Sequence, residues 1–252
     1  MNRRTFLAVG GTAAFGVIAG CLGGGAGSDP NGYGPEPETD PNAKAIDTSS
    51  YQTQVFEDFE GIEVPLAPIE DVFYWYQRQE ARIADARGSS QYEKSHIAGA
   101  VLSTAPPYTP DDDPVAGWSK SERIVTYCGC PHHLSGLRAA KLIENGYEEV
   151  YALDDGFGEW LDRSYPIEGA NVSADRATYT IQGQSDPAYA GRLVRLEQLD
   201  ADRLEAAPIA DDGSYTLQLH YAGATDSRFR VDAPEYTVEG TLDELTSTTV
   251  MP

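Results

Sequence analysis

The sequence has little positive charge. Eighteen lysines and arginines stand against forty aspartates and glutamates, which gives a net charge of −22, and only four of the basic residues are lysines. A surface this acidic repels nucleic-acid phosphates and anionic lipid head groups, so we expect no nucleic-acid partner. Because the acidic residues are spread over the whole chain, we interpret the charge as a halophilic adaptation that keeps the surface hydrated in high salt. The alternative is an acidic protein-binding surface.

Long apolar runs are also scarce. Residues 8–19 are apolar, but a helix that spans a membrane needs about 20 such residues. Before this run, Arg3-Arg4-Thr5-Phe6-Leu7 resembles a twin-arginine motif, and after it Val17-Ile18-Ala19-Gly20-Cys21 resembles a lipobox. We therefore predict a lipoprotein signal over 1–21, with lipidated Cys21 anchoring an extracytoplasmic protein to the cell membrane. An ordinary transmembrane anchor is the alternative.

Residues 22–50 contain mainly glycine, proline, asparagine and acidic residues, with almost nothing apolar to bury. This composition is typical of chains that cannot form a core. We therefore predict a disordered acidic linker over 22–50.

Residues 51–169 alternate between strand-like and helix-like segments. The β-branched and aromatic run 123–127 predicts a strand that leads directly to Cys128. Residues 135–145 have the pattern of a helix, with Ser135 as its N-cap and Gly146 just past its end. A further strand follows, and this order predicts an α/β domain whose parallel sheet is flanked by helices. The other expected elements are a helix over 69–80 and strands over 82–85, 100–102 and 149–153.

Residues 171–252 have a different pattern. Apolar and polar residues alternate in the runs 177–181, 214–219 and 236–239, and Asp211-Asp212-Gly213 has the composition of a turn. We predict a small all-β sandwich domain here. It is similar to carboxypeptidase-regulatory-like, transthyretin-type sandwiches. Its lone histidine, His220, has no cysteine near it in the sequence, so an adhesion or spacer role is expected.

Four features follow one another between residues 82 and 166. They are Asp85-Ala86-Arg87 with Gln91-Tyr92-Glu93 and His96-Ile97-Ala98-Gly99-Ala100; Ile124-Val125-Thr126-Tyr127-Cys128; Gly146-Tyr147 with Val150-Tyr151; and Asp155-Gly156-Phe157-Gly158-Glu159-Trp160 with Tyr165-Pro166. Together they resemble the rhodanese family, although Ser95 and Asp155 stand where that family usually has glycine. With the signal and the acidic composition, the resemblance implies a haloarchaeal-type rhodanese-like lipoprotein with a β-sandwich tail.

The resemblance implies a sulfurtransferase or persulfide carrier. A cysteine takes sulfane sulfur from a small donor, such as thiosulfate or a persulfide, and passes it to a thiol or cyanide without a cofactor. A cysteine between a strand and a helix faces backbone N–H groups and the positive end of the helix dipole, which stabilise a thiolate. Cys128 would then be the carrier, with histidines that supply positive charge to an anionic donor. The implied cradle consists of Gly129, Pro131, His132, His133, Leu134 and Ser135.

The loop is longer than is usual in the family, and this leaves two candidate nucleophiles. Counting from the strand selects Cys128, whereas counting back from Ala139-Ala140 selects Cys130. We favour Cys128, with Cys130 as the alternative nucleophile or the resolving cysteine. The supporting residues implied by the resemblance are an ion pair of Asp85 and Arg87 near the loop, and His96 as a structural histidine.

Two other classes of protein share such a loop. A phosphatase of this fold needs a loop arginine, and residues 129–135 contain none. Cys128, Cys130, His132 and His133 could ligate zinc or copper, but four ligands within six residues are cramped, and we predict no metal. The alternatives to a sulfurtransferase are therefore a non-catalytic rhodanese-like binding module and a Cys/His metal-binding lipoprotein.

Overall fold

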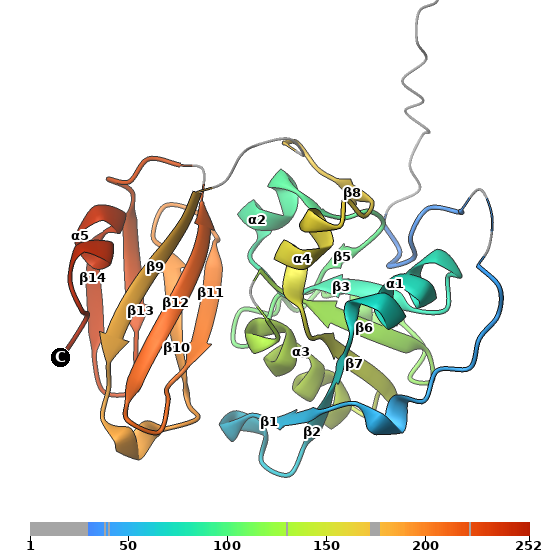
Figure 1. Ribbon diagram of the computed structural model, residues 1–252, viewed down its shortest axis with the longest axis horizontal. Helices are drawn as coiled ribbons and strands as arrows, with labels where there is room; N and C mark the ends of the chain where they lie inside the picture. Colours follow the sequence, from blue (N-terminus) through green and yellow to red (C-terminus); the bar gives the residue numbers. More distant parts are fainter. Residues whose placement is uncertain (1–29, 38, 40, 130, 172–176, 222) are drawn as a thin grey trace, which may run out of the picture.

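The computed structural model describes residues 30–252 except 38, 40, 130, 172–176 and 222. Residues 30–171 form an α/β part and residues 177–252 form a β part, which lie side by side in Figure 1.

A six-stranded sheet forms the centre of the α/β part, with strand order β1-β2-β7-β6-β3-β5. From β2 to β5 the neighbouring strands are parallel, and only β1 runs antiparallel to its neighbour. This confirms the predicted parallel sheet. The strands are β1 (Thr53–Val55), β2 (Glu63–Ala67), β3 (Arg82–Asp85), β5 (Val101–Leu102), β6 (Arg123–Tyr127) and β7 (Glu149–Leu153), with a separate pair of β4 (His96–Ile97) and β8 (Ile167–Glu168).

Helices cover both faces of this sheet, as expected. One apolar cluster contains Leu134 and Leu137 of the helix that follows Cys128, and another contains Trp160. The helices are α1 (Ile69–Gln77), α2 (Ser89–Lys94), α3 (His133–Glu144) and α4 (Gly156–Asp162), with short 3-10 turns η1 (Thr48–Ser50), η2 (Glu57–Phe59) and η3 (Pro114–Gly117).

Helix α3 begins earlier than predicted. Its N-cap is His132, in the left-handed region with a φ of 36°, and Ser135 lies inside the helix rather than at its start. The prediction that Ser135 is the N-cap was therefore wrong. The sequence pattern misled because the first turn is fixed by tertiary packing: Leu134 is buried, and the amide of Gly136 already donates to the carbonyl of His132 (3.0 Å).

Part of the predicted linker is bound to the α/β part. The amide of Gly32 donates to the carbonyl of Gly99 (2.9 Å), and the carbonyl of Gly32 accepts from the amide of Ile83 (2.7 Å). A side chain at Gly32 would collide with Trp118, and the φ of 91° also favours glycine. The predicted disorder therefore does not hold at Gly32.

The β part contains two antiparallel sheets, one of order β11-β10-β13-β14 and one of β12 and β9. They enclose a third apolar cluster that includes Leu217 and Phe229. This confirms the predicted all-β structure, while its likeness to transthyretin-type sandwiches stays a prediction. The elements are β9 (Ala177–Gln184), η4 (Pro187–Tyr189), β10 (Leu193–Gln198), β11 (Leu204–Pro208), β12 (Ser214–Tyr221), β13 (Arg228–Asp232), β14 (Thr237–Thr241) and α5 (Leu242–Ser247).

The two parts share an apolar core. Leu204 and Ala206 of β11 belong to the same buried cluster as Leu134, Leu137 and Cys128. Figure 1 shows β11 on the side of the β part that faces α2 and α3. The β part therefore packs on the end of the sheet from which Cys128 emerges.

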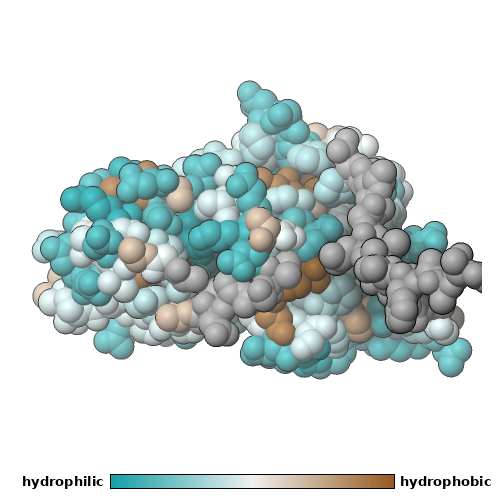
Figure 2. Space-filling model, turned by 90° about the horizontal axis from the view of Figure 1, so that it is seen from above, coloured by the Kyte–Doolittle hydropathy of each residue, from teal (hydrophilic) through white to brown (hydrophobic). Residues whose placement is uncertain are grey.

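The face of the molecule seen from above is mainly hydrophilic (Figure 2). Figure 2 shows a face covered largely by hydrophilic residues, with small hydrophobic patches between them. Within residues 30–252, as far as they are described, no helix combines the length and the apolar character that crossing a membrane requires. The predicted signal at 1–21, including Cys21, lies outside the described residues.

Candidate active site

Cys128 lies directly after β6, at the carboxyl edge of the parallel sheet. Ligands bind at this edge in open α/β sheets. The carbonyl of Cys128 accepts a hydrogen bond from the amide of Phe157 at the start of α4 (2.8 Å), which fixes the strand end. The thiol Sγ lies 3.4 Å from Oγ of Ser135 in the first turns of α3. The cysteine that the strand register selected thus faces the start of a helix.

The thiol is buried, and burial dominates its acidity. Cys128 is only 1% exposed. Burial raises the pKa of its thiol to about 11, although the hydroxyl and amide of Ser135 and the amide of Leu134 lower it. Cys128 is therefore a protonated thiol near pH 7 in this arrangement, rather than the thiolate that was predicted. The hydrogen bonds at the start of α3 lower the pKa of the thiol less than the loss of water raises it.

The two loop histidines differ in their surroundings. Nδ1 of His132 lies 3.0 Å from a carboxylate oxygen of Asp154, beyond the end of β7. His133 is half-buried, and the loss of water around its imidazole lowers the pKa of the ring to about 4, with a smaller effect from His132. The expectation that both histidines supply positive charge is therefore wrong for His133, which is neutral near pH 7.

A buried ion pair supports the strand end, as predicted. Arg87 and Asp85 are 2% and 0% exposed. Nη2 and Nε of Arg87 donate to the carboxylate of Asp85 at 2.6 and 2.9 Å, and the hydroxyl of Tyr127 donates to the same carboxylate at 2.6 Å. The pair therefore holds the residue that precedes Cys128.

His96 has the structural role that was expected. Its Nδ1 lies 2.7 Å from the carbonyl of Tyr92, and its ring stacks on the Tyr92 ring.

Trp160 is fully buried, and its indole N–H donates a hydrogen bond to the carbonyl of Pro166 (3.0 Å).

The β part contributes a carboxyl group that the sequence analysis missed. Glu205 on β11 is 3% exposed, and its Oε1 accepts from Nε2 of Gln91 on α2 at 2.9 Å. A methyl group on Gly129 would lie only 2.8 and 3.0 Å from the two carboxyl oxygens of Glu205. The sequence signal was a single acidic residue within the apolar run 204–207.

His220 of β12 also comes close to the loop, contrary to its isolated place in the sequence. A methyl group on Gly158 would lie 3.8 Å from Nε2 of His220 and 3.9 Å from the carbonyl oxygen of Gly129. The expected adhesion or spacer role did not anticipate that residues of the β part lie beside the Cys128 loop.

Among the described residues, no group of three or more His, Cys, Asp or Glu side chains is arranged to hold a metal ion. Cys130, which the metal hypothesis requires and which is also the alternative nucleophile, lies outside the described residues.

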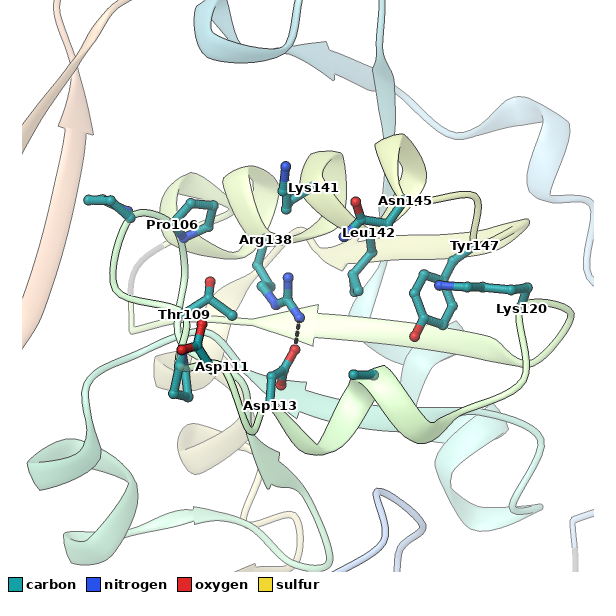
Figure 3. A pocket seen from close by; sticks show the side chains of 13 residues that line it. Pro106, Thr109, Asp111, Asp113, Lys120, Arg138, Lys141, Leu142, Asn145 and Tyr147 are labelled. Carbon is teal, nitrogen blue, oxygen red and sulfur yellow. Dashed lines mark hydrogen bonds and ion pairs between the residues drawn. The ribbon is translucent and has the colours of Figure 1, made fainter.

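A cavity of about 580 Å³ lies elsewhere, between residues 106–120 and the outer side of α3. Figure 3 shows its lining, with the ion pair of Arg138 and Asp113 in its wall and Lys120 over the ring of Tyr147. The Cys128 loop does not contribute to its lining, so this cavity is separate from the candidate active site.

Comparison with known proteins identifies a family. Residues 74–163 match the family described as rhodanese-like domain. The chain is 31% identical over 99 residues to the thiosulfate sulfurtransferase GlpE of Coxiella burnetii, which covers 38% of this chain and 84% of that protein. It is also 31% identical over 94 residues to an HTH-type transcriptional regulator of Mycobacterium tuberculosis, covering 37% of this chain and 40% of the regulator.

Similar solved structures include a protein from Bacillus halodurans, at 24% identity and a TM-score of 0.37, covering 43% of this chain and 83% of that one. The thiosulfate sulfurtransferase from Pseudomonas aeruginosa matches at 23% identity with a TM-score of 0.36, covering 43% of this chain and 20% of that protein.

Proposed function

The chain belongs to the rhodanese-like family, and from this premise we propose that it is a sulfurtransferase that carries sulfane sulfur as a persulfide on Cys128. The observation that carries the proposal is the place of Cys128, between the end of β6 and the first turn of α3, with Ser135 Oγ 3.4 Å from its sulfur. The relative named as a thiosulfate sulfurtransferase supports the same reaction class.

The reaction takes two displacements. Cys128 first loses its proton to water, because burial keeps its thiol protonated. The thiolate then attacks the outer sulfur of a donor such as thiosulfate; the bond between the two donor sulfurs breaks, and sulfite leaves with the electron pair. A thiolate or cyanide then attacks the outer sulfur of the persulfide, and the Cys128 thiolate leaves. The hydroxyl of Ser135 and the amides of Leu134 and Ser135 stabilise the anionic sulfur in both steps, since they already lower the pKa of the thiol.

Intact-mass spectrometry tests this proposal. The reduced protein is incubated with thiosulfate or an organic persulfide in high salt, as wild type, Cys128→Ser and Cys130→Ser. We expect a mass gain of one sulfur that cyanide removes and that only Cys128→Ser abolishes. A gain lost only in Cys130→Ser would reassign the nucleophile. No gain in folded wild type with any donor would refute sulfur transfer.

A non-catalytic binding module is the second candidate. It is favoured by the burial of Cys128, which belongs to an apolar cluster that includes Leu204 and Ala206 of β11, and by the raised pKa of its thiol. In that case the protein binds its partner with equal affinity as wild type and as Cys128→Ser, and persulfide never forms.

We further propose that the protein works outside the cytoplasm in high salt, tethered by lipidated Cys21. The twin-arginine-like and lipobox-like motifs and the net charge of −22 support this. Cys21→Ser should release the protein from the membrane fraction of the producing cell, and retention of that variant would contradict the lipid anchor.

A further inference from the structure

Glu205 is fixed at the contact between the α/β part and the β part. Nε2 of Gln91 donates to Oε1 of Glu205 at 2.9 Å. Oε1 of Gln91 in turn accepts from the amides of Gly88 at 3.2 Å and Leu204 at 2.9 Å. Because both polar atoms of the Gln91 side chain have partners, Gln91 is fixed and holds the carboxyl group of Glu205 through Oε1.

That position faces the Cys128 loop. The two carboxyl oxygens lie so close to Gly129 that a methyl group there would be 2.8 and 3.0 Å away. Gly129 directly follows Cys128, whose side chain packs in one apolar cluster with Leu204 and Ala206 on either side of Glu205. A reagent that approaches the thiol through this contact therefore meets the carboxyl group of Glu205.

The charge of this carboxyl group is set by its surroundings. Burial raises the pKa of Glu205 to about 7, against the effect of Arg203, Arg87 and Gln91, while Asp85 raises it further. When ionised, Glu205 also raises the pKa of the Cys128 thiol. Of the remaining titratable neighbours, His133 is neutral near pH 7 because its pKa is lowered to about 4, and His220 lies across the loop beside Gly158.

Building on the sulfur transfer proposed for Cys128, we propose that Glu205 is a specificity-determining residue that repels small anionic sulfur donors when ionised and leaves Cys128 to uncharged donors. Like charges repel strongly in a buried site, where little water screens them. Thiosulfate carries two negative charges, so it is disfavoured more than a neutral polysulfide. The β part is then a component of the active site that selects the donor by charge.

Two alkylating reagents of similar size and different charge test this directly. Iodoacetamide is neutral and iodoacetate is an anion, and peptide mass spectrometry measures the rate at which each modifies Cys128 in the full chain. In wild type we expect the ratio of the iodoacetamide rate to the iodoacetate rate to rise between pH 6 and pH 8, as Glu205 ionises. In Glu205→Gln this rise disappears, and the ratio at pH 8 falls by about tenfold.

Matched variants separate charge from structure. Glutamine keeps the shape of the side chain and an acceptor for Gln91. Glu205→Asp keeps the charge and should behave like wild type in its dependence on pH. Glu197→Gln removes one negative charge from β10, where Glu197 pairs with Arg230, and should leave the ratio unchanged.

The outcomes are decisive in both directions. The proposal would be overturned if the ratio of the iodoacetamide rate to the iodoacetate rate were the same in wild type and Glu205→Gln. This includes the case in which loosened packing accelerates both reagents equally. A thiol that neither reagent reaches in any variant would also overturn it, because a closed contact rather than charge would then exclude donors. Thiosulfate is tested on the same variants: a lowered ratio in Glu205→Gln with no persulfide in any variant would refute sulfur transfer but not charge selection.

Discussion

Replacing Arg87 with methionine removes one half of the buried ion pair beneath the Cys128 loop. The aliphatic part of the side chain is kept, so the change removes the charge and its hydrogen bonds to the carboxylate of Asp85 at 2.6 and 2.9 Å. Asp85 is 0% exposed and is left as a buried carboxylate with only Tyr127 as a side-chain partner among the hydrogen bonds described above.

We expect this change to lower the free energy of unfolding by about 3–5 kcal/mol, the range for breaking one partner out of a buried pair. Part of the loss is recovered in the double variant Asp85→Asn, Arg87→Met, because the uncompensated charge is then gone. The losses in free energy of unfolding of the single variants Asp85→Asn and Arg87→Met should therefore add up to about 1–3 kcal/mol more than the loss of the double variant.

Urea unfolding in high salt, followed by tryptophan fluorescence, measures these energies. Arg163→Met is the control, since Arg163 pairs with Glu70 and Glu159 at the surface and exposed pairs contribute about 0–1 kcal/mol. A loss below about 1 kcal/mol in Arg87→Met, or the same loss as in Arg163→Met, would refute the reasoning.

Three further changes test the surroundings of Cys128. Ser135→Ala removes the hydroxyl 3.4 Å from the sulfur, so the pKa of the thiol rises and iodoacetamide should modify Cys128 about three- to tenfold more slowly at pH 8. Gly88→Ala places a methyl group 1.6 Å from the carbonyl oxygen of Asp202, which should separate the two parts locally and speed hydrogen exchange in the loop. The raised pKa of Glu205 favours its protonated form in the folded state. The stability that this form contributes is present below pH 4.5 and is lost as the pH rises through about 7. Measured by urea unfolding, the free energy of unfolding of Glu205→Gln should therefore increase relative to that of wild type by up to about 3 kcal/mol between pH 5 and pH 8.

Each of these changes has its own contradicting result. An unchanged alkylation rate in Ser135→Ala would show that the hydroxyl does not stabilise the thiolate. Gly117→Ala is the control for Gly88→Ala, because a methyl group at Gly117 would meet nothing within 4 Å. Equal exchange in these two variants would show that the Gly88 contact does not hold the parts together. Parallel stability curves for wild type and Glu205→Gln would mean that Glu205 ionises normally.

Local sequence signals were sufficient for the strand and helix around the loop. The run 123–127 and the apolar spacing after it predicted β6 and α3, because β-branched residues and helical periodicity act within a few residues. The resemblance also implied the ion pair of Asp85 and Arg87, which the structure contains.

Contacts between distant segments could not be predicted in this way. Gln91 and Glu205 are 114 residues apart, and no periodicity in either segment indicates that they meet. The start of α3 and the raised pKa of Cys128 depend on the same packing, since Leu134 and Cys128 lie in one buried cluster that includes residues of β11. The sequence therefore predicted that Cys128 follows a strand and precedes a helix, but not that the carboxyl group of Glu205 faces its loop.

The pairing of Gly32 with Gly99 and Ile83 would shorten any tether that starts at Cys21. A fully extended chain spans at most about 3.5 Å per residue. If Cys21 holds the lipid, the 11 residues to Gly32 allow the folded part to rise about 40 Å from the membrane, whereas an unattached linker up to Tyr51 would allow about 100 Å. In that case Gly32 stays within about 40 Å of the bilayer, so the folded part that it is paired with stays beside the membrane surface.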